Sequence, residues 1–508
     1  METCKICHED QVKTAADVAK IRYAITSAKD YDGDGDVKEP IKGEVEGLQA
    51  ALLKAIQSYA KEVAGAEIKY DGATYPYFMG ADGKAYPNWT PRLLKAAYNY
   101  QFSVKDPGQY AHNSRYNIEL LYDSIEDLNA GTGLKTKTDM SKMNREDFGH
   151  FNGTGMAFRD WDADGEVPAT CAKCHSASGL PLIFANEGVT IVTNVNNKAL
   201  SALAQPISNG FMCSTCHNEE KWPERYFSAA VKFPSGKDGW FADADANVCL
   251  NCHQGRQSRS SVDAAIARVG GDEEVDKIPV DKDGKPNLSF TNPHYFAAGA
   301  TLLGTEVQGG YEYDEQKYSG RTMHPAVPPA TGLDCTNCHD IHTLELKTDA
   351  CATCHAGVKS LEEIRKPGDT VDYDGDGNTT EGFAGEIEGM NEALWTAISA
   401  YAKNTAKVAI VYDGHTNPYF FIDKNANGKA DADELKSDNR YYFTGKLLKA
   451  AYNYQWVSKD PGAFAHNFTY ANQLVYDSIK DLGGDVSKLK RAEVVAGAVP
   501  EQPKPPEE

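Results

Sequence analysis

The chain has 508 residues, of which 41% are hydrophobic, and its 73 acidic against 52 basic side chains give a formal net charge of -21. This acidic excess argues against a nucleic-acid partner and against anionic membrane surfaces, because both are bound through Lys and Arg. The length suggests roughly three domains, and the lack of any apolar run of about 18 residues predicts that no membrane span is present.

The chain opens on a CxxCH motif, and five more follow, which together use all 12 cysteines. A CxxC pair alone would also suit a zinc site, a redox dithiol or half of a disulfide framework. A histidine directly after every pair instead favours covalent haem, in which two thioether bonds hold the vinyl groups and the histidine is the proximal iron ligand. The sequence therefore predicts six c-type haems, attached at Cys4, Cys7, Cys171, Cys174, Cys213, Cys216, Cys249, Cys252, Cys335, Cys338, Cys351 and Cys354, with proximal ligands His8, His175, His217, His253, His339 and His355.

Each iron also needs a sixth ligand or an open position for chemistry. Of the 13 histidines six are proximal, which leaves seven (13 − 6) for six iron positions. The predicted distal ligands are His112, His150, His294, His324, His342 and His466, and His415 is the spare. Met156 and Met323 are alternative axial ligands, although a methionine in a core or at a surface is the commoner case.

An internal repeat supports this choice of histidines. Residues 30–78 match residues 372–420 at a constant offset of 342, and after a twelve-residue insertion in the second copy the phrases LLKAAYNYQ, KDPG, AHN and YDSI recur at an offset of 354. His112 aligns with His466, whereas His415 aligns with an alanine. The simplest pairing gives His112 to the haem at Cys4 and His466 to the haem at Cys351, although either could reach a neighbouring haem.

The elements expected in the first copy follow from periodicity. Apolar residues at helical spacing predict a helix over residues 48–63 and its counterpart over residues 390–401. A hairpin is expected over residues 75–86, turning at Asp82-Gly83. Two helices follow, over residues 91–102 and 107–128, the second with Asp106 as its N-cap and His112 in its early turns.

The central segment, residues 131–350, carries four motifs with little helical or strand periodicity between them. Here the haems themselves are expected to supply apolar core and cross-links. His342 follows proximal His339 by three residues and could therefore bind an adjacent haem.

These patterns predict a mainly α fold with extensive irregular loops, packed around six covalent haems, with short β-hairpins in a duplicated domain. The predicted domains are the first copy with motif 1 (residues 1–130), the central segment with motifs 2–5 (131–350), the second copy with motif 6 (351–485) and a disordered Pro/Glu tail (486–508).

Acidic loops add a predicted calcium chemistry. Asp423, Asn425, Asn427 and Glu434, with Gly428 between them, fit the twelve-position calcium loop, in which several oxygens converge on a hard cation. Three more loops share only its opening, the alternative being solvated acidic turns: Asp30, Asp32 and Asp34; Asp160, Asp162 and Asp164; and Asp372, Asp374 and Asp376. Their closing acids would have to come from elsewhere, such as Glu39 and Glu44 or the repeats Glu381 and Glu386.

The six motifs, the phrases NPHYFAAGATLLGTE, GGYEY and CHDIHTL, and the helix from AHN to YDSI resemble multihaem c-type cytochromes of metal-reducing and related anaerobic prokaryotes. The resemblance implies electron conduction through stacked bis-histidine haems across the periplasm, at the outer surface or in extracellular filaments. It also implies Cys pairs as attachment sites, the following His as proximal ligand and downstream His as distal ligands.

We therefore expect an electron carrier rather than an enzyme, with other cytochromes and extracellular acceptors as redox partners. Haem motifs near both sequence ends would permit head-to-tail self-association into a filament, the alternative being a monomeric shuttle or a surface complex subunit. A multihaem reductase of nitrite, hydroxylamine or tetrathionate is the rival, and it would need one open iron. A calcium-stiffened adhesion protein is a third, weaker interpretation. Haem is attached to CxxCH outside the cytoplasm, which predicts an exported protein, either extracellular or at the cell surface, with the periplasm as the alternative. The motif at Cys4 leaves no room for a signal peptide, and we therefore interpret the sequence as a mature or trimmed chain.

Overall fold

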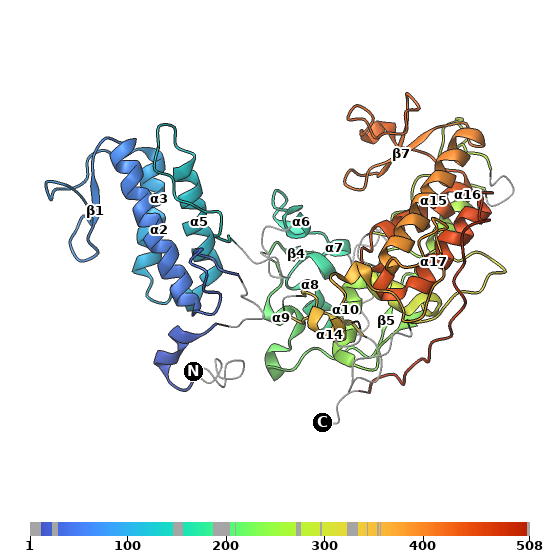
Figure 1. The fold of residues 1–508 in the computed structure, drawn as a ribbon, viewed down its shortest axis with the longest axis horizontal. Coiled ribbons are helices and arrows are strands. Elements are labelled where there is room, and N and C mark those ends of the chain that lie inside the picture. Colours follow the sequence, from blue (N-terminus) through green and yellow to red (C-terminus); the bar gives the residue numbers. More distant parts are fainter. Residues whose placement is uncertain are drawn as a thin grey trace. The chain divides into compact units, whose positions relative to one another are not determined.

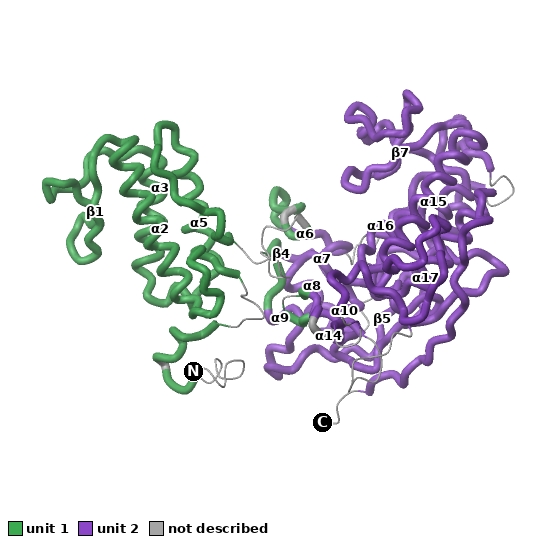
Figure 2. The backbone as a smooth tube through the Cα atoms, viewed as in Figure 1, with its two compact units in different colours: residues 1–165, 207–212, 340–345 green, residues 166–206, 213–339, 346–508 purple. Residues whose placement is uncertain are grey.

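The computed structural model describes residues 12–22, 29–145, 156–185, 204–208, 210–270, 276–294, 297–322, 334–342, 344–352, 355 and 357–504. The chain forms two compact units (Figure 2): unit 1 comprises residues 1–165, 207–212 and 340–345, and unit 2 comprises residues 166–206, 213–339 and 346–508. Among the helices that these residues form, none is both long and apolar enough to cross a bilayer.

Unit 1 is built on a bundle of three long helices, shown in blue to teal in Figure 1. Its elements are η1 (Ala15–Lys20), α2 (Ile41–Glu62), β1 (Ile68–Tyr70), β2 (Phe78–Gly80), α3 (Pro91–Lys105), α4 (Gln109–His112), α5 (Ser114–Asn129) and α6 (Met156–Arg159). The helix predicted over residues 48–63 is confirmed by α2, which begins seven residues earlier. Leu48, Leu52 and Ile56 recur on one face of α2 and are fully buried against α3 and α5.

Unit 1 contains the predicted hairpin and, before it, an antiparallel ladder that was not predicted. The ladder pairs β1 with β2, and Tyr70 lies opposite Phe78. The predicted hairpin turns at Asp82-Gly83, where Met79 and Ala85 form an antiparallel bridge and the Gly80 amide donates to the Lys84 carbonyl at 2.8 Å. Three-residue strands are too short to produce the alternating pattern from which a hairpin is predicted.

The second predicted helix is interrupted. The expected helix over residues 107–128 breaks at Asn113, whose backbone has φ −163° and ψ 80°, so that α4 and α5 are separate. The Asn113 side chain accepts from the Tyr116 amide at 3.1 Å and so caps α5. Asp106 is therefore not the N-cap of one long helix, and His112 is the last residue of α4.

Unit 2 combines a second helical bundle with many short elements. The short elements are β3 (Glu166–Val167), α7 (Ala169–His175), α8 (Gly179–Ala185), β4 (Gln205–Pro206), α9 (Cys213–Cys216), η3 (Glu219–Lys221), β5 (Val231–Lys232), β6 (Asp238–Gly239), α10 (Ala244–His253), α11 (Arg259–Arg268), α12 (Ala298–Leu303), η5 (Gly304–Glu306), α13 (Cys335–Cys338), α14 (Thr348–Ala352) and η6 (Leu361–Glu363). The bundle contains α15 (Phe383–Asn404), β7 (Ile410–Tyr412), β8 (Phe420–Ile422), η7 (Ser437–Asn439), α16 (Gly445–Ser458) and α17 (Ala463–Asp481). Antiparallel pairs join β3 to β4, β5 to β6 and β7 to β8.

The bundle of unit 2 has the same elements as that of unit 1. Both α2 and α15 have 22 residues, and their first residues, Ile41 and Phe383, are separated by the offset of 342. The amides of Tyr86 and Tyr441 donate to the carbonyls of Phe78 and Phe420 at 3.0 and 2.9 Å. The break at Asn113 has its counterpart inside α17 at Asn467, with φ −166° and ψ 78°.

The two bundles differ in what covers them. In unit 2 the core runs from the bundle into residues 213–339 of the predicted central segment, and these residues belong to the same unit as the second copy. Asn453 of α16 illustrates the contact, since its side chain accepts from the Tyr311 amide at 2.7 Å and donates to the Tyr311 carbonyl at 2.9 Å. The central segment therefore packs on the second copy through specific hydrogen bonds as well as apolar contacts.

The C-terminal segment is ordered by contacts that its composition does not reveal. Residues 486–508 were expected to be disordered, yet Arg491 forms an ion pair with Asp477 of α17 at 2.9 Å. Further along, the Trp240 ring nitrogen donates to the Pro500 carbonyl at 3.0 Å. The segment runs without helix or strand up to residue 504, and hydrogen bonds to its backbone hold it on unit 2.

Candidate haem sites

The CxxCH motifs that the structure describes adopt a helical turn. Motifs 2–5 lie in or at the ends of α7, α9, α10 and α13, and motif 6 lies at the end of α14. The amides of His217, His339 and His355 each donate to the carbonyl of the first cysteine of their motif at 2.9 Å. Because residues three apart share one face of a helical turn, both sulfurs of a motif point to the same side, with the histidine beside the first of them. This is the donor arrangement that covalent haem needs.

The motifs of unit 2 lie next to one another. The Cys174 sulfur is 4.0 Å from the Asn251 carbonyl, and the Cys252 sulfur is 3.9 Å from the Lys173 carbonyl, so motifs 2 and 4 are adjacent. The thiols of Cys249 and Cys335 also contact each other, which brings motif 5 beside motif 4. In the haem-bound protein these atoms would be thioether sulfurs, and the thiol contacts mark how closely the attachment points approach.

The described cysteines differ in their surroundings. Burial, with a smaller effect of the neighbouring Cys249, raises the pKa of the Cys216 thiol to about 11. A hydrogen bond with Cys249 and burial together raise the pKa of Cys335 well above its usual range. A hydrogen bond with Cys252 instead lowers the pKa of Cys174 to about 7, and Cys213 is exposed.

The imidazole rings of His175 and His294 lie next to each other. Their ring centroids are 6.0 Å apart, and the ring planes are nearly perpendicular, at 88°. Two metal–nitrogen bonds of about 2 Å and the two ring radii also sum to roughly 6 Å. His175 follows Cys171 and Cys174, so the pair lies beside an attachment site.

The backbone and the surroundings of His294 are unusual. Its φ is 66°, in the left-handed region, where a residue other than glycine is uncommon and often marks a functional site. The amide donates to the Asn292 side chain at 2.9 Å. Burial, with the charges of Arg256 and His175, lowers the pKa of His294 to about 4. The imidazole is thus held neutral, as a metal ligand must be.

His112 and His466, the histidines shared by the two copies, are each oriented by a carboxylate. Nδ1 of His466 is 2.8 Å from Asp460, and Nδ1 of His112 is 2.8 Å from Asp106. Metal-bound histidines commonly donate their second ring nitrogen to a carboxylate, which fixes the ring and directs Nε2 to the metal. Both histidines are therefore prepared as ligands through Nε2.

A glycine four residues earlier makes room for each of these rings. A Cβ added at Gly462 would lie 2.6 Å from Cε1 of His466, and a Cβ at Gly108 would lie 2.6 Å from Cε1 of His112. The phrase KDPG followed by AHN thus encodes an orienting acid, a glycine that the ring covers, and the histidine predicted to be a ligand. Neither the acid nor the glycine was predicted as a site residue, although the recurrence of KDPG, with its Asp six residues before the histidine, was a signal for both.

The environments of the two histidines differ. The side chain of His466 is 21% exposed, whereas that of His112 is 70% exposed. Burial by itself lowers the pKa of His466, but the charge and hydrogen bond of Asp460 outweigh it and raise this pKa.

The remaining predicted ligands are placed as follows. Nδ1 of His217 lies 2.7 Å from the Pro223 carbonyl, which again leaves Nε2 for a metal. The His342 amide donates to Asp340 at 2.9 Å within unit 1. The spare His415 lies in an exposed turn, and its amide donates to Asp413. Cys4, Cys7, His8, His150, His324, Met323 and Cys354 lie outside the described residues, as does the side chain of Met156.

The loop from Asp423 to Glu434 closes on itself. The amides of Asn427 and Gly428 donate to the two Asp423 carboxylate oxygens at 3.2 and 2.8 Å, and Gly428 has φ 76°. One carboxylate oxygen of Glu434, Oε1, accepts from the Lys424 amide at 2.7 Å. The other, Oε2, has no hydrogen-bond partner among the described residues, although Glu434 is only 1% exposed. Asp431, which was not predicted as a site residue, accepts through Oδ2 from the side-chain nitrogens Nδ2 of Asn425 and Asn427 at 2.9 and 2.8 Å.

The two loops with the sequence DYDGDG gather the acids that were expected to close them. Groups of three carboxylates whose oxygens lie within 4.8 Å of one another are Asp30, Asp32, Glu44; Asp32, Asp34, Glu39; Asp372, Asp374, Glu386; and Asp374, Asp376, Glu381. Burial and the neighbouring acids raise the pKa of Asp32 to about 6 and that of Glu39 to about 7. An arginine balances part of this charge, since Arg365 pairs with Glu386 at 2.6 Å and Arg22 pairs with Glu44. Calcium at these loops stays a prediction.

The third acidic loop is different. Asp160, Asp162 and Asp164 are all exposed in the turn after α6. Within the part of the chain that the structure describes, they join no group of three convergent ligands.

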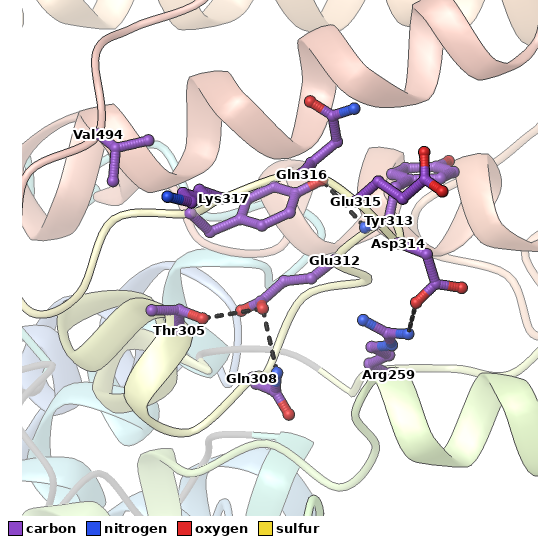
Figure 3. Close-up of a pocket in the computed structure, with 11 residues that line it drawn as sticks. Arg259, Thr305, Gln308, Glu312, Tyr313, Asp314, Glu315, Gln316, Lys317 and Val494 are labelled. Atoms are coloured by element: carbon purple, nitrogen blue, oxygen red, sulfur yellow. Dashed lines mark hydrogen bonds and ion pairs between the residues drawn. The ribbon is translucent and has the colours of Figure 1, made fainter.

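A pocket of about 410 Å³ in unit 2 is lined by polar side chains that already satisfy one another (Figure 3). Arg259 pairs with Asp314, while Thr305 and Gln308 donate to Glu312 at 2.9 and 3.2 Å. Its described lining contains neither cysteine nor histidine. The described lining of the pocket therefore offers no ligand for a haem iron.

Curated proteins similar to this chain are polyhaem cytochromes. The chain is 27% identical over 401 residues to "C-type polyheme cytochrome OmcB" of Geobacter sulfurreducens, from strains DL-1 / KN400 and PCA, and this match covers 68% of the chain and 48% of the relative. It is 26% identical over 426 residues to "C-type polyheme cytochrome OmcC" of strain PCA, a match that covers 72% of the chain and 50% of the relative. The chain thus spans about half the length of these relatives. No family model and no solved structure matches it. The relatives confirm the predicted resemblance to multihaem c-type cytochromes.

Proposed function

We propose that this chain, which is similar to C-type polyheme cytochromes, transfers electrons through six c-type haems, each held by a CxxCH pair and ligated by two histidines. The observation that carries the proposal is the pair His175 and His294, whose perpendicular rings lie 6.0 Å apart beside Cys171 and Cys174. When bound, haem supplies one-electron iron chemistry, and the protein supplies attachment, orientation and burial.

The residues of the chain have distinct roles in this function. The cysteine pairs on helical turns fix the attachment points, and the contact of Cys174 with the Asn251 carbonyl keeps two of these points close. Asp460 orients His466 through Nδ1, which raises the basicity of the ligand. Ligand basicity, burial and nearby carboxylates are the means by which a protein tunes haem potential. Spacing and insulation meet the needs of an electron conduit without a substrate pocket.

We propose that the protein is exported and exchanges electrons with other cytochromes or extracellular acceptors. The covalent attachment of haem to CxxCH outside the cytoplasm supports export. Head-to-tail self-association into a filament stays a prediction from the duplicated ends of the sequence.

The function is tested by ligand replacement in the holoprotein. Mass spectrometry of the purified protein should show six attached haems, and electron paramagnetic resonance should show low-spin ferric iron. His294→Ala should convert one haem to high spin, whereas the control His415→Ala should leave the spectrum unchanged. A wild-type protein with fewer haems, or an unchanged spectrum for His294→Ala, would contradict the proposed ligation.

We also propose that the loop from Asp423 to Glu434 binds calcium. The buried and unpartnered Oε2 of Glu434 supports this, because a buried carboxylate oxygen with no donor is costly unless a cation or hydrogen bond compensates it. Positions 1, 3, 5 and 12 of the loop supply side-chain oxygens, and Asp431 stands at position 9. The exit of the loop continues into Phe443, whose amide donates to the Leu288 carbonyl at 2.8 Å, so calcium would stiffen a contact with the chain segment leading to His294.

Trypsin tests the calcium loop, because Lys424 and Lys429 are exposed within it. At free calcium near 100 times the dissociation constant, cleavage that requires the loop to open should slow about 100-fold. Glu434→Gln should abolish this protection, whereas Asp433→Asn, which removes an exposed charge at a non-ligand position, should retain it. Equal cleavage with calcium and with chelator in the wild type would refute the site.

A further inference from the structure

A row of exposed apolar side chains runs along the bundle of unit 1. Leu94, Tyr98 and Phe102 lie four residues apart on α3 and are 53%, 69% and 44% exposed, and Tyr116 of α5 is 48% exposed. The rings of Phe102 and Tyr116 lie 6.2 Å apart, so the two helices contribute to one surface. We call these four side chains the α3–α5 face. Exposed apolar surface of this extent on one face commonly marks a site of interaction.

The same positions are buried in unit 2. At the offset of 354, the counterparts of the α3–α5 face are Leu448, Tyr452, Trp456 and Tyr470. Leu448, Tyr452 and Tyr470 are 0% exposed, and Trp456 is 2% exposed. The two copies thus present nearly the same side chains, and they differ in whether something covers them.

In unit 2 the cover is the segment of residues 297–322. The Tyr452 hydroxyl donates to the Gly309 carbonyl at 2.9 Å, and the Tyr470 hydroxyl donates to Glu312 at 3.0 Å. A Cβ added at Gly309 would overlap Trp456. The segment therefore fits this face through small residues that let its backbone approach the rings.

The polar groups that hold the cover in unit 2 also occur in unit 1. Asn453 clamps the backbone of Tyr311 and donates to the Ser478 hydroxyl at 3.0 Å. Its counterpart Asn99 makes the matching bond to Ser124, also at 3.0 Å.

Asn467, where the helix α17 is interrupted, makes a second hydrogen bond that holds residues 297–322. Asn467 donates to the Gly320 carbonyl at 3.0 Å and is 3% exposed, and its counterpart Asn113 is exposed. Both anchors of the cover are thus present beside the α3–α5 face.

We propose that the α3–α5 face of unit 1 docks a polypeptide segment of the same chemistry as residues 297–322, supplied by a partner protein. Such a segment has paired glycines where the aromatic rings pack, an adjacent tyrosine whose backbone pairs with Asn99, and an acid that accepts from the Tyr116 hydroxyl. A second copy of this chain is the weaker occupant, because its own residues 297–322 are already bound by α16 and α17.

Docking would also cover a haem ligand. His112 precedes Asn113 directly; in unit 2 the equivalent Asn467 is buried against the cover, and the side chain of His466 is only 21% exposed. The bound partner would therefore shield His112 from water, and it would lower the solvent exposure of His112 as well as that of the α3–α5 face.

The test uses the full-length holoprotein and a synthetic peptide with the sequence of residues 297–322, immobilised for a binding measurement. The wild-type protein should bind the peptide, and photo-crosslinking from the position of Tyr311 should label α3. Tyr98→Glu should weaken binding at least about tenfold, as expected for a central aromatic contact. The matched control is Tyr75→Glu, which changes a tyrosine that is 83% exposed in the loop between β1 and β2 and is not one of the four side chains of the face.

A second variant places the change in the peptide and so avoids any effect on protein folding. Valine at the positions of Gly309 and Gly310 should abolish binding, because in unit 2 an added Cβ would overlap Trp456 at the first position and Leu474 at the second, and their counterparts in unit 1 are Phe102 and Leu120. The proposal is overturned if the wild type does not bind the peptide, if the valine peptide binds equally, or if Tyr98→Glu binds like the wild type. Self-association that Tyr98→Glu abolishes, without peptide binding, would make a second copy the occupant and would also overturn it. None of these outcomes depends on the haem spectra that test electron transfer.

Discussion

Tyr98 and Tyr452 form a matched pair of side chains in identical local sequence, and their replacement by alanine should have very different effects. Tyr452 is fully buried, and its hydroxyl donates to the Gly309 carbonyl at 2.9 Å, whereas Tyr98 is 69% exposed. Removing a buried aromatic ring costs about 3–5 kcal/mol through lost burial and the cavity left behind. The stranded Gly309 carbonyl adds about 1 kcal/mol. Tyr98→Ala should change stability by no more than about 0.5 kcal/mol, as is usual at a surface.

The measurement should report on each unit separately, because a chain with two units and covalent cofactors need not unfold in one step. Hydrogen-exchange mass spectrometry during a urea titration gives one midpoint for peptides of α3 and another for peptides of α16. For an m-value of about 2–3 kcal/mol per M, Tyr452→Ala should lower the α16 midpoint by roughly 1–3 M. Similar shifts of the urea midpoint in the two variants would refute the inference that residues 297–322 pack on the second copy and stabilise it, whereas the corresponding face of the first copy is exposed.

The other predictions concern the histidines shared by the two copies. His466→Ala, and equally His112→Ala, should convert one haem to high spin in electron paramagnetic resonance, and His415→Ala should not; the opposite pattern would overturn the ligand assignment made from the repeat. Asp460→Asn should leave the haem attached but raise its midpoint potential, because the carboxylate 2.8 Å from Nδ1 raises ligand basicity; an unchanged potential in voltammetry would count against this role. Gly462→Ala should reduce the low-spin fraction, because its Cβ would lie 2.6 Å from the ring of His466, and a wild-type spectrum would show that the ring can move away without losing the iron.

Local signals in the sequence predicted some features well. The helical spacing of Leu48, Leu52 and Ile56 is sufficient to predict α2, because a helix that packs on one side must repeat its apolar residues every three or four positions. The break at Asn113 was not predicted, because an asparagine between two helical stretches is compatible with either a continuous or a capped helix.

Other features depend on residues that are distant in the sequence. That His294 faces His175 follows from the path of the chain over more than a hundred residues, which no spacing rule describes. The role of Asp460 lies between these cases, since the repeat shows the KDPG phrase but gives no reason for it until the carboxylate is seen at the ring nitrogen.

The sequence by itself determined the chemistry of this protein: twelve cysteines in six CxxCH motifs specify covalent haem, because the attachment reaction and the proximal ligand both depend on adjacent residues. Only the tertiary structure decided which face of the repeated bundle is buried in each unit. Tyr98 and Tyr452 have the same neighbours in sequence, yet one is exposed and the other buried. The physical reason is that burial depends on what packs against a surface, and residues 297–322 pack against the face built by α16 and α17.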